Sequence, residues 1–194
     1  MKSLLIYFLL IAAVICVGCG GNAAPIQNSS EKNISAEEKN KSKSNTIVVY
    51  FSHTKHTAAV AKKIQQATHA DIYEIVPEKP YPAEYHPATE VAKKEQEENA
   101  RPAIKGNLPN LDDYDTIILG FPIWWYSTPM IVNTFLESYD FTGKTIAPFC
   151  TSGGSGIEYA VDTIKTLAKG ATVTEGLVAN DSSKISTWLQ KIMK

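Results

Sequence analysis

Short runs of apolar and β-branched residues recur along the chain after residue 45, and segments with the apolar spacing of a helix separate them. The runs predict five strands, at residues 46–51, 71–76, 116–121, 144–150 and 171–178. The intervening segments predict helices at residues 57–68, 88–100, 130–139, 157–168 and 184–193. Such alternation is typical of an α/β fold in which a doubly wound parallel sheet carries helices on both faces. We therefore expect one domain of this kind over residues 46–194.

The third predicted strand reads TIILGF and is hydrophobic without interruption, so we expect both of its faces to be buried. In sheets of this kind, ligands bind at the carboxyl ends of the strands, where the strand order reverses. The loops that follow residues 51, 121 and 150 are therefore the first places to look for a functional site.

Residues 1–19 have the pattern of a secretory leader. Lys2 precedes an apolar run, residues 4–17, that is shorter than the ~20 residues needed for a membrane-spanning helix. The sequence Gly-Cys-Gly at residues 18–20 resembles the lipobox of bacterial lipoproteins, in which the cysteine becomes the lipidated first residue. This resemblance implies a lipid on Cys19 and a protein anchored to a membrane of the cell envelope, outside the cytoplasm. An ordinary signal or an uncleaved anchor is the alternative.

Residues 20–45 are rich in Asn, Ser, Lys and Glu and contain almost no large apolar side chains. A segment of this composition cannot bury enough apolar surface to offset the entropy lost on ordering it. We expect a disordered tether between the leader and the domain.

Charge and cysteine content exclude several kinds of protein. The formal net charge of -1 at pH 7 supplies no basic field, which argues against a nucleic-acid partner. Cys16 and Cys19 fall in the leader, so only Cys150 belongs to the domain. A disulfide within the domain is therefore impossible and a cysteine-based metal site is disfavoured. We expect Cys150 to be a small buried side chain.

The loop after the first strand is rich in hydroxyl side chains and leads directly into a predicted helix. Unpaired backbone N–H groups and the positive end of the helix dipole make such a junction a phosphate site. The alternative is that a hydroxyl only caps the helix. The candidate phosphate-binding residues are Ser52, His53, Thr54, Lys55, His56 and Thr57.

The loop after the third strand carries three consecutive aromatic side chains between two prolines. These rings cannot all point inward, and a flat aromatic ligand would account for the exposed ones. Packing on the core or on a second copy is the alternative. The candidate ligand-binding residues here are Pro122, Ile123, Trp124, Trp125 and Tyr126.

The loop after the fourth strand contains three glycines among residues 151–156. Glycine lets the backbone approach a ligand closely, so that its N–H groups can donate to the ligand's edge. Ile157 stands where a G-x-S-x-G elbow needs its last glycine, which disfavours a serine hydrolase. The candidate residues of this loop are Thr151, Ser152, Gly153, Gly154 and Gly156.

The second and third loops, PIWWYSTP and FCTSGGSG, are similar to those of one branch of the flavodoxin-like FMN-binding proteins. The similarity runs from residue 46 to about the C-terminus. It implies a flavodoxin-like fold of five parallel strands in three layers, with FMN held by the candidate residues of the three loops. The first loop departs from the flavodoxin pattern S/T-x-T-G-x-T, because Lys55 takes the glycine position and His56 stands where Asn is common. A left-handed backbone there would strain Lys55 by ~1 kcal/mol.

The resemblance also implies electron transfer or oxidoreduction carried by the flavin, with no catalytic acid or base from the protein. The partner would be a redox protein or a small electron acceptor. One alternative is an NAD(P)H:quinone-type reductase, and another is a module that has lost FMN and binds a different phosphate-bearing or aromatic ligand. Tyr81, Tyr85 and His86 are candidates to cover the pocket, or else they pack within a proline-rich loop.

Overall fold

A computed structural model of the protein describes residues 45–193. The expected leader at residues 1–19 and the expected tether at residues 20–45 lie outside the described residues, except for Asn45. Within the described part of the chain, no helix combines the length and the apolar character needed to cross a membrane.

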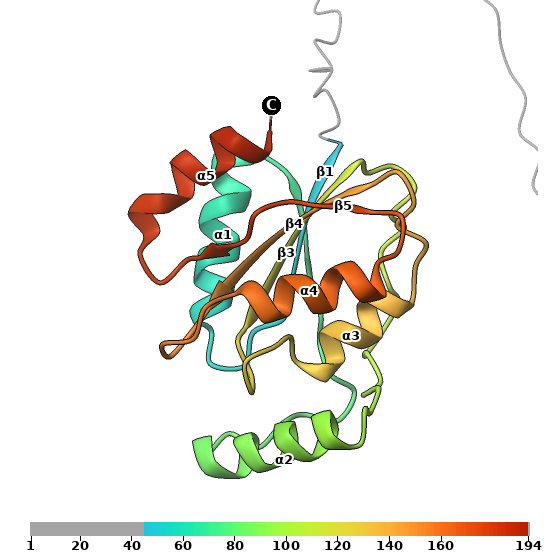
Figure 1. The fold of residues 1–194 in the computed structure, drawn as a ribbon, viewed down its shortest axis with the longest axis vertical. Helices are drawn as coiled ribbons and strands as arrows, with labels where there is room; N and C mark the ends of the chain where they lie inside the picture. The colour runs from blue at the N-terminus through green and yellow to red at the C-terminus, as the bar shows by residue number, and fades with distance from the viewer. Residues whose placement is uncertain (1–44, 194) are drawn as a thin grey trace, which may run out of the picture. The chain divides into compact units, whose positions relative to one another are not determined.

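The described domain is built on one parallel sheet (Figure 1). Its strands lie in the order β2-β1-β3-β4-β5, and β6 pairs with the remaining length of β4. The bounds are Thr46–Tyr50 for β1, Asp71–Glu74 for β2, Thr116–Pro122 for β3, Thr145–Thr151 for β4, Thr172–Val173 for β5 and Leu177–Val178 for β6. The order reverses between β1 and β3, which confirms the predicted doubly wound sheet.

Helices cover both faces of the sheet and complete the three predicted layers (Figure 1). On one face, α1 (His56–Thr68) and α5 (Ile185–Ile192) pack on Val48 and Tyr50 of β1. On the other face, α3 (Met130–Glu137) and α4 (Glu158–Leu167) pack with the alternate positions of the same strand. Residues 117–119 and 121 of β3 are fully buried, as the unbroken hydrophobic run predicts.

The last predicted strand is not continuous, which corrects the expectation for residues 171–178. The strand is divided into β5 and β6, which pair in parallel with opposite ends of β4. Between them, the carbonyl of Glu175 accepts a hydrogen bond of 3.0 Å from the indole N–H of Trp188 in α5. At Gly176, a Cβ atom would lie 2.9 Å from the side chain of Ile157. The backbone therefore bends here to meet two helices instead of continuing the ladder.

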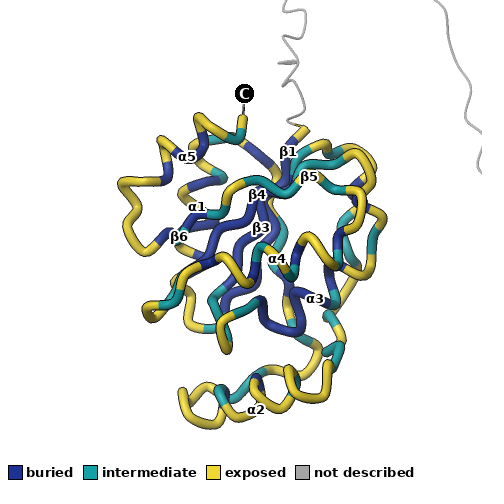
Figure 2. Tube along the Cα trace, viewed as in Figure 1, coloured by how far each residue is buried: buried dark blue, intermediate teal, exposed yellow. Residues whose placement is uncertain are grey.

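The second predicted helix lies earlier than expected. It forms α2 (Tyr85–Glu97), which begins before residue 88 and ends before residue 100. Pro87 lies in its first turn, where a missing backbone N–H costs little, so the proline does not exclude this segment from the helix. The helix lies apart from the sheet, and only Ala88 and Ala92 are buried (Figure 2), as expected for a charged, exposed helix.

The second strand is also shorter than predicted, because β2 ends at Glu74 and residues 75–76 lie beyond it. Pro77 instead forms an antiparallel bridge with Ile104, and Lys105 N–H donates to the Val76 carbonyl at 2.7 Å. The chain thus leaves the parallel ladder at this point to pair with a later segment.

Gly120 of β3 provides a test of the sheet packing. It pairs with Phe149 of β4, and a Cβ atom at residue 120 would clash with the fully buried Phe149 ring. We expect Gly120→Ala to lower the free energy of unfolding by about 1–3 kcal/mol, the usual cost of overpacking. Gly153→Ala is the control, because a Cβ atom there meets nothing within 4 Å. Equal denaturant midpoints for the two variants would contradict the packing described.

Candidate functional site

Three loops meet at the carboxyl edge of the sheet because β1, β3 and β4 are parallel neighbours. The first and third loops are joined by the hydroxyls of Thr57 and Thr151, which lie 2.8 Å apart. The second and third are joined by Ile123 N–H, which donates to the Thr151 carbonyl at 2.9 Å. The first and second meet where the rings of His53 and Trp124 pack at 5.8 Å between centroids. The three predicted loops therefore form one site.

In the first loop, side-chain hydroxyls shape the backbone and leave N–H groups open. Ser52 is buried and its Oγ accepts from Ala58 N–H at 3.1 Å, and Thr57 is also buried. Thr54 Oγ1 lies 2.9 Å from Nδ1 of His56. No group among residues 45–193 accepts a hydrogen bond from the backbone N–H groups of residues 54–57. These donors, at the positive end of the α1 dipole, can hold an anion.

The second loop is a tight hairpin with strained aromatic residues at its tip. Trp124 and Ser127 exchange two backbone hydrogen bonds of 3.1 and 3.0 Å, and φ is 46° at Trp125 and 67° at Tyr126. Two successive left-handed residues define a type I′ turn, which normally uses Asn or Gly. A left-handed backbone costs about 1–2 kcal/mol for each such side chain. Strain of this kind is concentrated at functional sites.

Helix α2 holds this hairpin in place. The Trp125 indole N–H donates to the Thr89 carbonyl at 3.0 Å, and the Gln96 amide donates to the Trp125 carbonyl at 3.3 Å. The ammonium group of Lys93 lies 5.5 Å from the centroid of the Trp125 ring. The strained turn is therefore fixed by contacts outside the loop itself.

The three aromatic side chains of the hairpin do not all point inward, as predicted. Trp124 packs edge-on against Phe51, at 5.4 Å between centroids, and against Tyr81, at 4.9 Å. Trp125 lies partly exposed against α2, and Tyr126 is largely exposed. The Trp124 ring thus extends the core toward the site, and the rings of Trp125 and Tyr126 remain accessible to solvent.

Of the three residues considered as a cover, the structure brings only Tyr81 to the aromatic cluster. Tyr81 donates to a Glu95 carboxylate oxygen at 2.8 Å, and burial, followed by this hydrogen bond, raises the pKa of Tyr81 above its ordinary value. Burial also raises the pKa of Glu95. Tyr85 and His86 lie in the first turn of α2 and pack on each other at 5.5 Å. Tyr81 therefore links the site to α2.

The third loop is open on one side and fixed on the other. Gly154 has a φ of 149°, which only glycine adopts readily, and a Cβ atom at Gly153 or Gly154 would meet nothing within 4 Å. Asn180 Oδ1 accepts from Ser152 N–H at 2.9 Å, and Asn180 Nδ2 donates to the Ser152 carbonyl at 2.6 Å. Space beside the glycines is therefore available to a ligand, and the two hydrogen bonds with Asn180 fix the position of the loop backbone.

Cys150 lies at the base of this loop and is fully buried, as expected. Burial, with a smaller contribution from the charge of Glu158, raises the pKa of its thiol to about 12. A thiol with this pKa is almost entirely protonated at neutral pH and is therefore a poor nucleophile.

The chain matches the flavodoxin family model over residues 45–192. It belongs to the flavodoxin family. A putative flavoprotein from Bacteroides uniformis ATCC 8492 is 40% identical, with a TM-score of 0.67, over 78% of this chain and 99% of its own. One from Bacteroides eggerthii DSM 20697 is 36% identical, with a TM-score of 0.67, over 77% of this chain and 98% of its own.

A more distant solved structure has the same fold. It is a flavoprotein from Lactobacillus acidophilus NCFM in complex with FMN, 24% identical to this chain, with a TM-score of 0.62. The match covers 74% of this chain and 97% of that protein. A search of curated proteins gave no match.

Asn180 is the member of this flavodoxin site that sequence reasoning missed. It lies two residues after β6, a strand that also ends at the carboxyl edge of the sheet. The signal in the sequence was therefore the position of Asn180 directly after a strand. Because the predicted last strand was continuous, the sequence did not indicate that its end pairs with β4 and brings Asn180 next to the third loop.

Lys55, which departs from the flavodoxin pattern, has the left-handed backbone that the glycine position suggests. Its φ is 68°, and its exposed ammonium group lies 3.5 Å from a Glu74 carboxylate oxygen. An exposed ion pair of this kind contributes little to stability. The strain at Lys55 therefore has no large compensation from this contact.

We expect Lys55→Gly to raise the free energy of unfolding by up to about 1 kcal/mol. Relief of left-handed strain, about 1–2 kcal/mol, exceeds the entropic cost of a new glycine, about 0.4–1 kcal/mol. Lys62→Gly is the matched control, because Lys62 is exposed within α1 and glycine there costs about 1 kcal/mol. Urea unfolding checks both variants. An equal loss of stability in the two would show that residue 55 carries no backbone strain.

Proposed function

We propose that this flavodoxin-family chain binds FMN and acts as an electron carrier. The observation that carries the proposal is the convergence of unpaired N–H groups at residues 54–57 with an aromatic hairpin and an open glycine loop. This arrangement suits a ligand with a phosphate at one end and a flat hydrogen-bonding ring at the other. The FMN complex of the flavoprotein from Lactobacillus acidophilus, which shares the fold, supports the same cofactor.

Each loop has a separate task in this proposal. The N–H groups of residues 54–57 hold the phosphate at the start of α1, and Ser52 and Thr57 maintain the shape of that loop. Trp124 or Trp125 would pack against the flat ring, and the N–H groups of residues 153, 155 and 156 would donate to its edge, while Gly154 N–H donates to Ser152 Oγ at 3.1 Å. Bound FMN supplies the redox chemistry, accepting and releasing electrons.

The protein also adjusts the potential of the bound group. An apolar tryptophan ring beside it disfavours negative charge there, because charge is poorly solvated at an apolar face. Backbone N–H donors from the glycine loop have the opposite effect, because they stabilise negative charge at the edge that they contact. The balance between these two loops sets the potential at which electrons are exchanged.

The lipid anchor is part of the same proposal. The Gly-Cys-Gly sequence at residues 18–20 supports lipidation of Cys19, and the polar composition of residues 20–45 supports a flexible tether to the domain. The domain then works outside the cytoplasm with a redox protein or a small electron acceptor. Because nicotinamide cofactors are cytoplasmic, this placement disfavours NAD(P)H as the electron donor.

FMN binding is tested by titrating FMN into the purified full chain and following the quenching of flavin fluorescence. We expect combined replacement of Trp124 and Trp125 by Ala to weaken binding about 10-fold or more, because the change removes apolar surface buried against the ring and also the additional ~0.5–1.5 kcal/mol of an aromatic pair. Tyr159→Ala is the control, since Tyr159 is an exposed aromatic residue of α4 outside the three loops.

Thermal unfolding of each variant without FMN shows whether weaker FMN binding reflects lost contacts with the ring or a destabilised fold. A variant that unfolds at the wild-type temperature has lost only the contacts. A wild-type chain that neither quenches FMN nor gains thermal stability from it would contradict the proposed function. The site would then be better explained by the alternative of a flavodoxin-like module that binds another phosphate-bearing or aromatic ligand.

Lipidation is tested by expressing the chain in a bacterial host supplied with a radiolabelled fatty acid. We expect label on the wild-type protein and its recovery in the membrane fraction, and neither for Cys19→Ser. Cys16→Ser is the matched control, because Cys16 lies in the apolar run and should not carry the lipid. Label that persists in Cys19→Ser would contradict the assignment.

A further inference from the structure

A cavity of about 470 Å³ lies at the amino edge of the sheet, where α1 ends and β2 begins. This is the edge at which β1 starts, at the opposite end of the strands from the three loops (Figure 1). Helix α1 has 13 residues, so its length of about 20 Å separates the two edges. The described lining of the cavity includes none of the candidate residues of the three loops. The cavity is therefore separate from the proposed flavin site, and its volume is within the range of roughly 300–1,000 Å³ usual for small-molecule sites.

Hydrogen-bond acceptors are prominent in the polar wall of this cavity. The Asp71 carboxylate accepts from the Tyr114 hydroxyl at 2.7 Å. The Tyr73 hydroxyl donates to the Asn107 carbonyl at 3.4 Å, so both phenol protons are engaged and both phenol oxygens can accept from a ligand. No lysine or arginine belongs to the described lining, and Lys144, which donates to the Tyr114 carbonyl at 2.8 Å, lies outside it. The wall therefore favours a ligand that supplies hydrogen-bond donors.

The C-terminal end of α1 gives this cavity a negative potential. The last turn of α1 contains no basic residue, and no group among residues 45–193 donates to the carbonyls of residues 66–68. The uncompensated negative end of a helix dipole attracts a cation. The hydrogen bond to Asp71, followed by burial and the charges of Asp71 and Asp113, raises the pKa of Tyr114 to about 12. The raised pKa is consistent with negative surroundings at the cavity wall.

The lining suits an organic cation better than a metal ion. Among the described residues, no three His, Cys, Asp or Glu side chains are grouped closely enough to hold a metal. The cavity is instead lined by the rings of Tyr73 and Tyr114, whose faces attract a cation, and by apolar surface from Ile47 and Ile72. Ile72 is 40% exposed, so it is accessible to an apolar part of a ligand.

We propose that this cavity binds a primary ammonium group carried on a short apolar stem. The three N–H donors of such a group match the Asp71 carboxylate and the phenol oxygens of Tyr73 and Tyr114. The stem then contacts Ile72. A quaternary ammonium carries the same charge but has no N–H to donate. The proposal goes beyond the flavin site and does not depend on whether the chain binds FMN.

The test is an NMR titration of the ¹⁵N-labelled full chain in detergent with n-butylammonium chloride, compared with tetramethylammonium chloride at equal concentration. We expect saturable shifts of the amides of residues 69–73, no shifts at residues 54–57, and an affinity for tetramethylammonium at least ~5-fold lower, since it makes no hydrogen bond.

We expect Asp71→Asn to weaken n-butylammonium binding at least ~10-fold, because the charge-assisted hydrogen bond is lost while the amide oxygen still accepts from Tyr114. Asp112→Asn is the matched control, because it removes the same charge from an exposed residue outside the lining. Thermal unfolding of both variants shows whether the fold is retained.

Gln65→Lys and Gln66→Lys form a second pair that leaves Asp71 in place. Both changes add one positive charge to the last turn of α1, but only Gln65 lines the cavity. We expect Gln65→Lys to abolish n-butylammonium binding, because its own ammonium group would occupy the cavity, and Gln66→Lys to weaken binding by less than ~3-fold through a screened surface charge. An equal effect of the two lysines would overturn the proposal, as would equal affinity of wild type and Asp71→Asn, or the absence of saturable binding.

Discussion

The parallel pairing of β1, β3 and β4 is the constraint on which the rest of this structure depends. Tyr50 pairs with Gly120, and Pro122 pairs with Thr151, so three strands end at nearly the same level. Three loops that are far apart in the sequence therefore open at one edge, and each supplies a different chemistry. A change of register in any of these strands would separate the backbone donors, the aromatic hairpin and the glycine loop.

The loops at this edge combine strain with firm support. Lys55, Trp125 and Tyr126 all have left-handed backbones, at a cost that the adjoining structure must offset. Hydrogen bonds with residues outside the loops support the hairpin, through Thr89 and Gln96, and the third loop, through Asn180, whereas Lys55 has no comparable support. Backbone groups that are not used in this way, at residues 54–57, remain available to a ligand.

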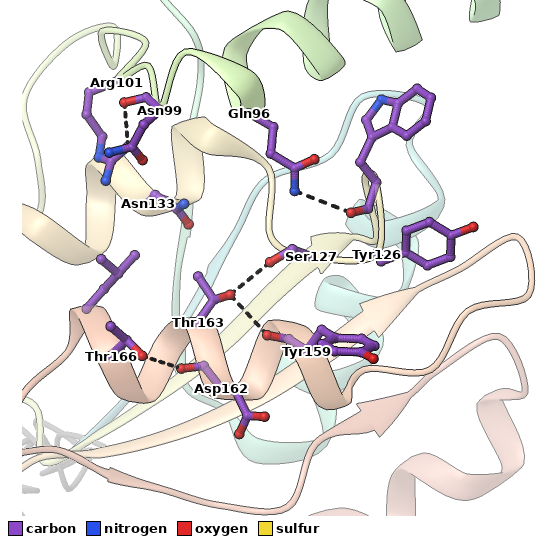
Figure 3. A pocket seen from close by; sticks show the side chains of 12 residues that line it. Gln96, Asn99, Arg101, Tyr126, Ser127, Asn133, Tyr159, Asp162, Thr163 and Thr166 are labelled. Carbon is purple, nitrogen blue, oxygen red and sulfur yellow. Dashed lines mark hydrogen bonds between the residues drawn. The ribbon is translucent and has the colours of Figure 1, made fainter.

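The alternation of strands and helices, and the three loops, could be predicted because they depend on local hydrophobic patterns and on the residues that follow each strand. Features created by distant contacts could not. The split of the last strand depends on Trp188, and the Trp125-Tyr126 turn lacks the Asn or Gly that normally marks its type. A groove of about 750 Å³ between α2, the hairpin and α4 (Figure 3) gathers side chains from residues 96 to 167, so only the folded chain shows it.

The most direct test of the central claim is a crystal structure of the FMN-loaded protein. The account predicts that the phosphate accepts hydrogen bonds from the backbone N–H groups of residues 54–57 and that the ring lies between the hairpin and residues 152–156. A phosphate bound elsewhere, or a flavin ring that contacts neither the hairpin nor residues 152–156, would contradict it.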